Sequence, residues 1–132
     1  MSSTFTLLIS GSPSGTQAHL SALRFARCAL AQNHQISNIF FYQDAVAVAN
    51  RFNVTPSDEN NLAQSWLNLS KQYQIELQVC IAAANRRGII SDEEAKQNHI
   101  DSHSLQAGFH LLGLGQLAAS LSQPQNKLIH FK

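Results

Sequence analysis

The spacing of hydrophobic residues changes from segment to segment along the chain. Short runs rich in apolar residues cover residues 5–10, 36–42, 75–79 and 127–131. Between the first two runs, apolar residues recur every three to four positions from about residue 16 to residue 34. Short apolar runs are typical of buried strands, whereas the wider spacing is typical of an amphipathic helix. The chain therefore begins with a predicted strand, a turn, a helix and a second strand.

Helical patterns also separate the later strands. Residues 45–52 predict a short helix, and residues 62–74 predict a longer one, which Ser57 or Asp58 could cap. Between the third and the last strand, residues 81–87 and 111–121 predict helices, and residues 97–108 read as a polar loop.

Ser91 and Glu94 have the spacing of a capping box, which predicts one more short helix at this point of the chain. Strands that alternate with helices in this way predict an α/β fold. We expect residues 1–132 to form a single domain of three layers, α/β/α, around a mostly parallel sheet.

Composition narrows the choice of partners. Charged residues make up only 13% of the chain and the net charge is +1, so no overall field attracts nucleic acid or a membrane. We expect no direct contact with nucleic acid. The low charge also favours contacts with other subunits. No segment has the ~20 apolar residues of a membrane span, and the first residues lack the features of a signal peptide, so we expect a cytoplasmic protein.

Cys80 is the residue whose position points most clearly to chemistry. It ends the strand 75–79 and opens the helix 81–87. A thiol reacts as the thiolate, and the N-terminus of a helix favours the anion. The alanines at 82–84 would let a partner's sulfur approach without a lid having to move. A cysteine at the end of an apolar strand can also be a small buried hydrophobe, and both interpretations stay open on this evidence.

Three other side chains are candidates for the surroundings of this thiol. Tyr42 ends the second strand and could line the cysteine pocket or simply pack. Arg86 and Arg87 lie at the far end of the helix, about 10 Å along its axis from Cys80, and are better placed to dock an acidic partner than to touch the thiolate.

The remaining candidates favour structural roles. Cys28 lies within a predicted helix and is expected to pack in the core, while His19 is expected at the surface. His99 and His103 are four residues apart but stand in a polar segment without a third ligand of recognisable spacing, so we expect no metal site.

Three separate stretches resemble the DsrE/DsrF-like family: FFYQDAV at 40–46, QVCIAAANRRGI at 78–89 and GFHLLGLGQL at 108–117. The resemblance implies a flavodoxin-like sheet and a persulfide on Cys80, with no cofactor and no metal. It also implies a heterohexamer with TusB-like and TusC-like subunits, a TusA-like sulfur donor and a TusE-like acceptor. The pathway implied is 2-thiolation of the wobble uridine of tRNA.

Two alternatives remain at this point. The same cysteine could serve sulfur oxidation of the DsrE type, or the chain could be a non-catalytic scaffold in which Cys80 is only packed. Accessibility of Cys80 to a thiol reagent would separate transfer from scaffolding, whereas the sequence does not separate the two pathways.

Overall fold

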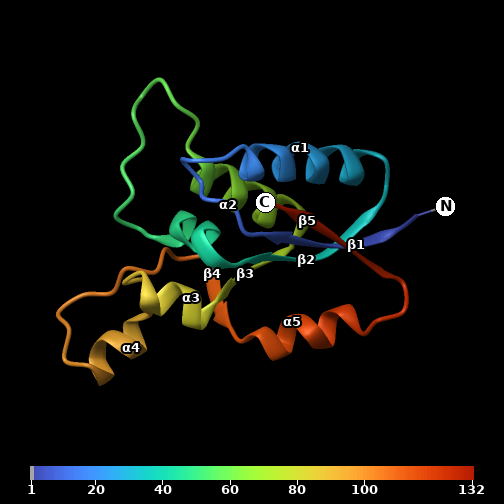
Figure 1. The fold of residues 1–132 in the computed structure, drawn as a ribbon. Helices are drawn as coiled ribbons and strands as arrows, with labels where there is room; N and C mark the ends of the chain where they lie inside the picture. Colours follow the sequence, from blue (N-terminus) through green and yellow to red (C-terminus); the bar gives the residue numbers. More distant parts are fainter. Residues whose placement is uncertain (1) are drawn as a thin grey trace.

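Five parallel strands form one sheet in the computed structural model, which describes residues 2–132 (Figure 1). The order across the sheet is β4-β3-β2-β1-β5. The strands are β1 (Thr4–Ile9), β2 (Gln35–Phe41), β3 (Glu76–Cys80), β4 (Phe109–Leu112) and β5 (Asn126–Phe131). The helices are α1 (Ala18–Ala31), the 3₁₀ helix η1 (Gln43–Ala49), α2 (Leu62–Tyr73), α3 (Ile81–Arg86), α4 (Asp92–Gln97) and α5 (Leu114–Leu121).

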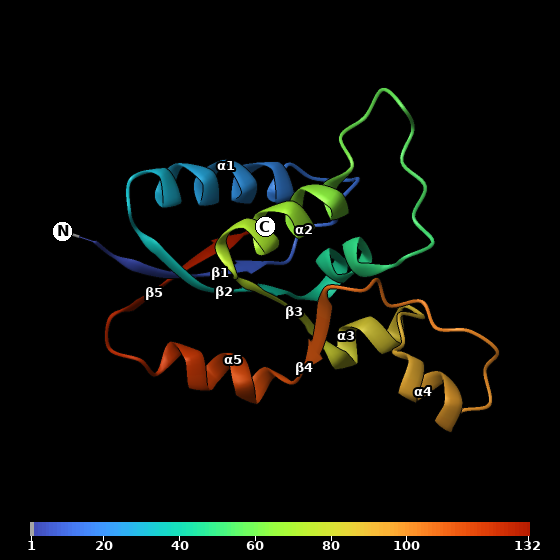
Figure 2. The same cartoon turned by 180° about the vertical axis from the view of Figure 1, so that it is seen from behind.

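Helices cover both faces of this sheet. Figures 1 and 2 show α1 and α2 on one side, with α3, α4 and α5 on the other. The three-layer α/β fold predicted from the sequence is confirmed, and every strand pair in the sheet is parallel. Within this class the strand order is 4-3-2-1-5, which differs from the 2-1-3-4-5 order of flavodoxin. No helix between residues 2 and 132 combines the length and apolar character of a membrane span.

The face toward α1 and α2 is apolar, because alternate residues of each inner strand point to it. These residues are fully buried: Leu7, Ile9, Ile39, Phe41, Leu77 and Val79. Burial on this scale supplies most of the driving force for folding, at about 25 cal/mol per Å² of apolar surface. Burial of one face fixes the register in which the inner strands pair, and this register places their carboxyl ends side by side.

The opposite face, toward α5, carries a polar network centred on Asn38. Its side-chain oxygen accepts hydrogen bonds from the hydroxyls of Thr6 at 2.9 Å, Ser37 at 2.9 Å and Ser120 of α5 at 3.0 Å. Its Nδ2 donates to Gln78 of β3 at 2.8 Å. The network joins β1, β2, β3 and α5, and it shows that Gln78 points to the α5 side of the sheet.

Two sequence predictions for elements after η1 are wrong in detail. The helix predicted for 111–121 is a strand, β4, followed by the shorter helix α5, because Gly113 ends the strand in extended backbone and caps the helix. The cap of α2 is Asn61, whose side chain accepts from Gln64 N, rather than Ser57 or Asp58. The capping box predicted at Ser91 is confirmed.

Candidate functional site

Cys80 is the last residue of β3 and the N-terminal cap residue of α3, so the junction predicted from the sequence is present. Its backbone is extended, with φ −61° and ψ 118°, and the chain turns directly into the helix without an intervening loop. β3 is an inner strand, flanked by β2 and β4. Cys80 therefore stands at the carboxyl edge of the sheet, where ligands and catalytic groups collect in open α/β sheets.

The register of the sheet identifies the neighbours of this cysteine. Leu112 of β4 pairs with Cys80 directly. On the other side Phe41 pairs with Val79, so Tyr42 is next to Cys80 at the ends of β2 and β3. Since side chains alternate along a strand, Cys80 points to the same α5 side as Gln78. Tyr42, which is half-buried, shares this edge of the sheet.

The thiol is covered in the isolated chain. Cys80 is 2% exposed, and Ala83 and Ala84 beside it are also buried. The expectation that the alanines leave an open approach is therefore wrong, because two of them pack inward against the core instead of lining a free path. A partner's sulfur can reach Cys80 only if a neighbouring group shifts.

Cys28 has the opposite environment, and the prediction that it packs in the core is wrong. It is exposed on α1, and its sulfur accepts a hydrogen bond from Gln32 Nε2 at 3.5 Å. It follows Arg24 by one helical turn and lies next to Arg27, so it belongs to the polar face of α1.

The two arginines of α3 differ in what they contact. Arg87 Nη2 donates to Asp44 Oδ1 at 2.9 Å, and its Nη1 donates to the carbonyl of Ala83 at 3.0 Å. These bonds tie the end of α3 to the start of η1, which also packs against α3 and β3. Arg86 is exposed. Of the two arginines, Arg86 is therefore the exposed one that does not make the bonds described for Arg87.

A groove lies beside Cys80 along β4. It has a volume of about 470 Å³, and we call it the β4 groove. Its lining residues are Glu76, Ile81, Ser91, Glu93, Glu94, Leu105 and the four residues of β4. Because Glu76 begins β3 and Ile81 follows its last residue, the groove extends along the whole of β4 and ends next to the cysteine.

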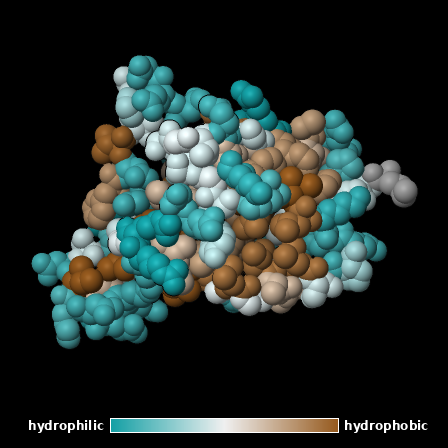
Figure 3. Space-filling model, viewed as in Figure 1, coloured by the Kyte–Doolittle hydropathy of each residue, from teal (hydrophilic) through white to brown (hydrophobic). Residues whose placement is uncertain are grey.

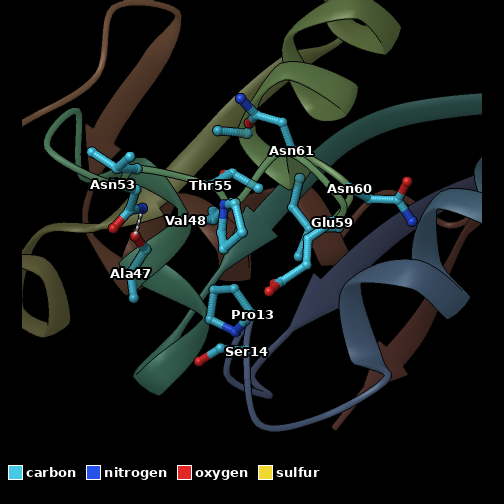
Figure 4. Close-up of a pocket in the computed structure, with 13 residues that line it drawn as sticks. Pro13, Ser14, Ala47, Val48, Asn53, Thr55, Glu59, Asn60 and Asn61 are labelled. Carbon is cyan, nitrogen blue, oxygen red and sulfur yellow. Dashed lines mark hydrogen bonds between the residues drawn. The ribbon is translucent and has the colours of Figure 1, made fainter.

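A second hollow, of about 290 Å³, lies between the turn after β1 and the long segment before α2 (Figure 4). Pro13 and Ser14 form one wall, and Asn53, whose Nδ2 donates to Ala47 O at 2.8 Å, is at the other. Its lining does not include Cys80 or the other side chains that the sequence singled out.

His19 is buried, not exposed as expected. Its Nε2 lies 3.1 Å from Gly11 O, and Trp66 Nε1 donates to its Nδ1 at 3.1 Å. The ring also stacks on Phe41. An indole N–H only donates and a carbonyl only accepts, so Nδ1 must be unprotonated and Nε2 must carry the hydrogen. Burial lowers the pKa of His19 to about 4, against a smaller opposing effect of the hydrogen bond to Gly11.

The histidines considered for metal binding do not converge. His99 is exposed with a positive φ of 56°, while His103 Nδ1 lies 3.7 Å from Asp92. Within residues 2–132, no three His, Cys, Asp or Glu side chains are arranged to hold a metal ion.

The arrangement described so far matches a known family. The model of the DsrE/DsrF-like family matches residues 3–131. This chain belongs to that family. It is 40% identical over 128 residues to a Vibrio cholerae protein described as a sulfurtransferase TusD homolog, with 97% of each chain covered. A Serratia proteamaculans protein described as sulfurtransferase TusD is 42% identical over 128 residues, which are 96% of this chain and 98% of that one.

A solved structure shares the fold. The crystal structure of the ychN protein from E. coli superposes with a TM-score of 0.70 over 98% of this chain and 100% of that one, at 22% identity. The family resemblance predicted from the three sequence stretches is confirmed, and so is the fold class.

Sequence reasoning missed two contacts near the candidate site. Leu112 was assigned to a helix, so its pairing with Cys80 was not expected. Asp44 was not connected with Arg87, because nothing in the local pattern of either segment indicates an ion pair across 43 positions. The short FHLL run after Gly108 was the available signal for β4.

Proposed function

We propose that this chain is a sulfurtransferase subunit that carries sulfane sulfur as a persulfide on Cys80. The observation that carries the proposal is the position of Cys80 at the carboxyl end of an inner parallel strand and at the start of a helix. Membership of the DsrE/DsrF-like family and the names of the TusD relatives support it.

The transfer step needs no oxidant and no cofactor. The Cys80 thiol gives its proton to solvent, and its thiolate attacks the terminal sulfur of a carrier's persulfide. A bond forms between Cys80 Sγ and that sulfur, the carrier's S–S bond breaks, and the carrier leaves as a thiolate. The terminal sulfur is then passed on by the same exchange with the next carrier.

The complex and pathway form the finer part of the proposal. We place the chain in a cytoplasmic heterohexamer with TusB-like and TusC-like subunits, receiving sulfur from a TusA-like donor and giving it to a TusE-like acceptor for 2-thiolation of tRNA. Sulfur oxidation of the DsrE type would use the same cysteine. A scaffold role, in which Cys80 is only packed, is favoured by one observation, the 2% exposure of its side chain.

Other side chains have distinct proposed roles. Tyr42 would line the pocket of the persulfide, since the register puts it beside Cys80. Arg86 would contact an acidic side of a carrier from the surface of α3. We expected Arg87 to share that docking role. Its bonds to Asp44 and to Ala83 O instead support a role in holding η1 against α3. To dock a carrier, Arg87 would have to give up these bonds.

Intact-mass spectrometry after incubation with a small-molecule persulfide donor tests the proposal. We expect a gain of one sulfur atom at Cys80, located by peptide mapping, that builds up slowly in the isolated chain because this thiol is 2% exposed, whereas the exposed Cys28 can gain sulfur as well. The Cys28→Ser variant should gain the sulfur at Cys80 as before, and the Cys80→Ser variant should not. Sulfur located on Cys28 alone, or none on either thiol of the assembled complex, would replace the proposal with the scaffold role.

A further inference from the structure

We propose that the β4 groove binds an extended, cationic, cysteine-bearing segment of the sulfur acceptor, which adds as a strand to the open edge of β4. The inference rests on the proposed function of Cys80, because the segment it describes is the one that would take sulfur from that residue. The binding itself can be measured without any sulfur transfer.

The edge of the sheet supplies the first argument. β4 is the end strand of the sheet, and its sheet neighbour is β3. An end strand presents backbone N–H and C=O groups on its outer side, and an extended peptide can pair with them. In this chain the β4 groove lies along that strand, where a helix would otherwise cover it. Residue 110 of the strand is exposed and residue 111 is half-buried.

The charge of the groove supplies the second argument. Three of its lining residues are glutamates, and of the described residues that line it none is lysine or arginine. Glu94 is held within the chain, because its carboxylate accepts from Ser91 N at 2.9 Å and from Asn85 Nδ2 at 2.7 Å. Glu76 and Glu93 are exposed at the rim. Two exposed carboxylates beside an open strand favour a basic segment, mainly through specificity and the rate of encounter.

The distance to the thiol supplies the third argument. Leu112, the last residue of β4, pairs with Cys80, and Ile81, which is 38% exposed, closes the same end of the groove. A strand added to β4 lies about 4.8 Å from it and about 10 Å from β3. A cysteine at the end of that strand is then separated from Cys80 by one strand, at Leu112, and transfer requires the buried thiol to become accessible. Burial of Cys80 in the free chain then slows loss of the persulfide to small thiols until the segment docks.

The step at this site is the second half of the relay. The acceptor's cysteine gives its proton to solvent, and its thiolate attacks the terminal sulfur of the Cys80 persulfide. A new S–S bond forms on the acceptor, the bond between Cys80 Sγ and the terminal sulfur breaks, and Cys80 leaves as a thiolate. No other reactant is required.

Synthetic peptides of about ten residues with one cysteine test the proposal on the full chain carrying Cys28→Ser. One peptide has lysine and arginine around the cysteine, one has glutamate, and a third is the basic peptide with N-methylated backbone amides. Hydrogen exchange measures the protection of residues 109–112 by each peptide before any sulfur is loaded on Cys80. Mass spectrometry measures the rate of sulfur transfer after loading of Cys80.

We expect the basic peptide to protect β4 and to accept sulfur about fivefold faster than the acidic one at low salt, which corresponds to about 1 kcal/mol of rim electrostatics. N-methylation should remove both effects. Glu76→Gln with Glu93→Gln should remove the preference for basic residues, whereas Glu59→Gln, at an exposed carboxylate in the other hollow, should preserve it.

Equal behaviour of the two peptides, preference for the acidic one, or protection outside 109–112 would overturn the inference. These results are distinguishable from failure of the proposed function. If Cys80 accepts no sulfur from the small donor, the proposed function fails, while the exchange measurement still decides whether the β4 groove binds the basic segment.

Discussion

Iodoacetamide should label Cys28 well before Cys80 in the folded chain, although Cys80 is the proposed sulfur carrier. Cys28 is exposed on α1, whereas Cys80 is 2% exposed, and alkylation requires access as well as thiolate. The check is a time course of labelling at neutral pH, with each site quantified by peptide mapping. In denaturant the two rates should become similar. Faster labelling of Cys80 in the native chain would show that the edge of the sheet opens without a partner.

Acid should destabilise the fold through His19. Burial lowers its pKa from 6.5 to about 4, so the unfolded chain binds a proton in this range and the folded chain does not. The contribution is complete above pH 6.5 and is lost as the pH falls towards 4. The difference corresponds to about 3 kcal/mol in the free energy of unfolding.

Urea unfolding at several pH values, followed by the fluorescence of Trp66, measures this loss. His19→Gln offers an amide oxygen for the indole and an amide hydrogen for Gly11 O but does not titrate, so its stability should vary less between pH 6.5 and 4. Parallel pH profiles for the two proteins would assign acid sensitivity to other groups.

Individual side chains were predicted less well than the segments that contain them. His19 lies three and four residues before Ala22 and Leu23, which are buried, so it shares the inner face of α1. Cys28 shares the outer face with Arg24. Residue type favoured a surface histidine and a buried cysteine, and the helical position decided the opposite in both cases.

Among the elements, β4 was the one assigned to the wrong class. The segment from Phe109 to Leu121 is apolar almost throughout, and a short apolar run does not reveal whether it is a strand or part of a buried helix. Pairing with β3 decides the matter, and that contact joins residues about 32 positions apart, as in Leu77 and Phe109. The other strands were predicted because helical patterns separate them clearly in the sequence.

Two glycines at the ends of β4 and α5 should respond oppositely to alanine. Gly108 has φ +98°, and an added Cβ would collide with the side chain of Leu67, so Gly108→Ala should lower the free energy of unfolding by about 2 kcal/mol. Gly115 lies in α5 with open space around its Cα, so Gly115→Ala should raise it by about 0.5 kcal/mol. Urea unfolding measures both, and a neutral Gly108→Ala would contradict this placement of β4 against α2.

On the scale of the whole molecule, apolar and polar surfaces are separated. Figure 3 shows hydrophilic residues gathered over α4 and a broad apolar area over the half that carries β5 and α5. Leu128 of β5 is 42% exposed and Leu114 of α5 is 47% exposed. Apolar surface of this kind commonly marks contacts with other chains, which supports the proposed assembly with TusB-like and TusC-like subunits.

Replacing Leu128 and Leu114 by glutamate should therefore weaken assembly while the chain still folds, because both side chains are close to half exposed in the isolated subunit and a carboxylate at either position can reach solvent. Co-purification with the TusB-like and TusC-like subunits, followed by light scattering, measures how much of the complex assembles. Val54→Glu is the matched control, since Val54 is 92% exposed on the segment before α2. An intact heterohexamer with both leucines replaced would place the interface elsewhere.

The network around Asn38 has a consequence for how sequences of this kind can diverge. One amide joins Thr6, Gln78 and Ser120, which come from three different elements. Loss of Gln78 takes away the acceptor of Asn38 Nδ2 and leaves a buried donor that costs about 1–3 kcal/mol, whereas Oδ1 keeps other donors when either hydroxyl is lost. Replacing the amide and all its hydrogen-bond partners together by apolar residues of similar shape costs far less. In an alignment of relatives, positions 38 and 78 should therefore covary most strongly, while positions 6 and 120 should vary more freely as long as position 38 stays polar.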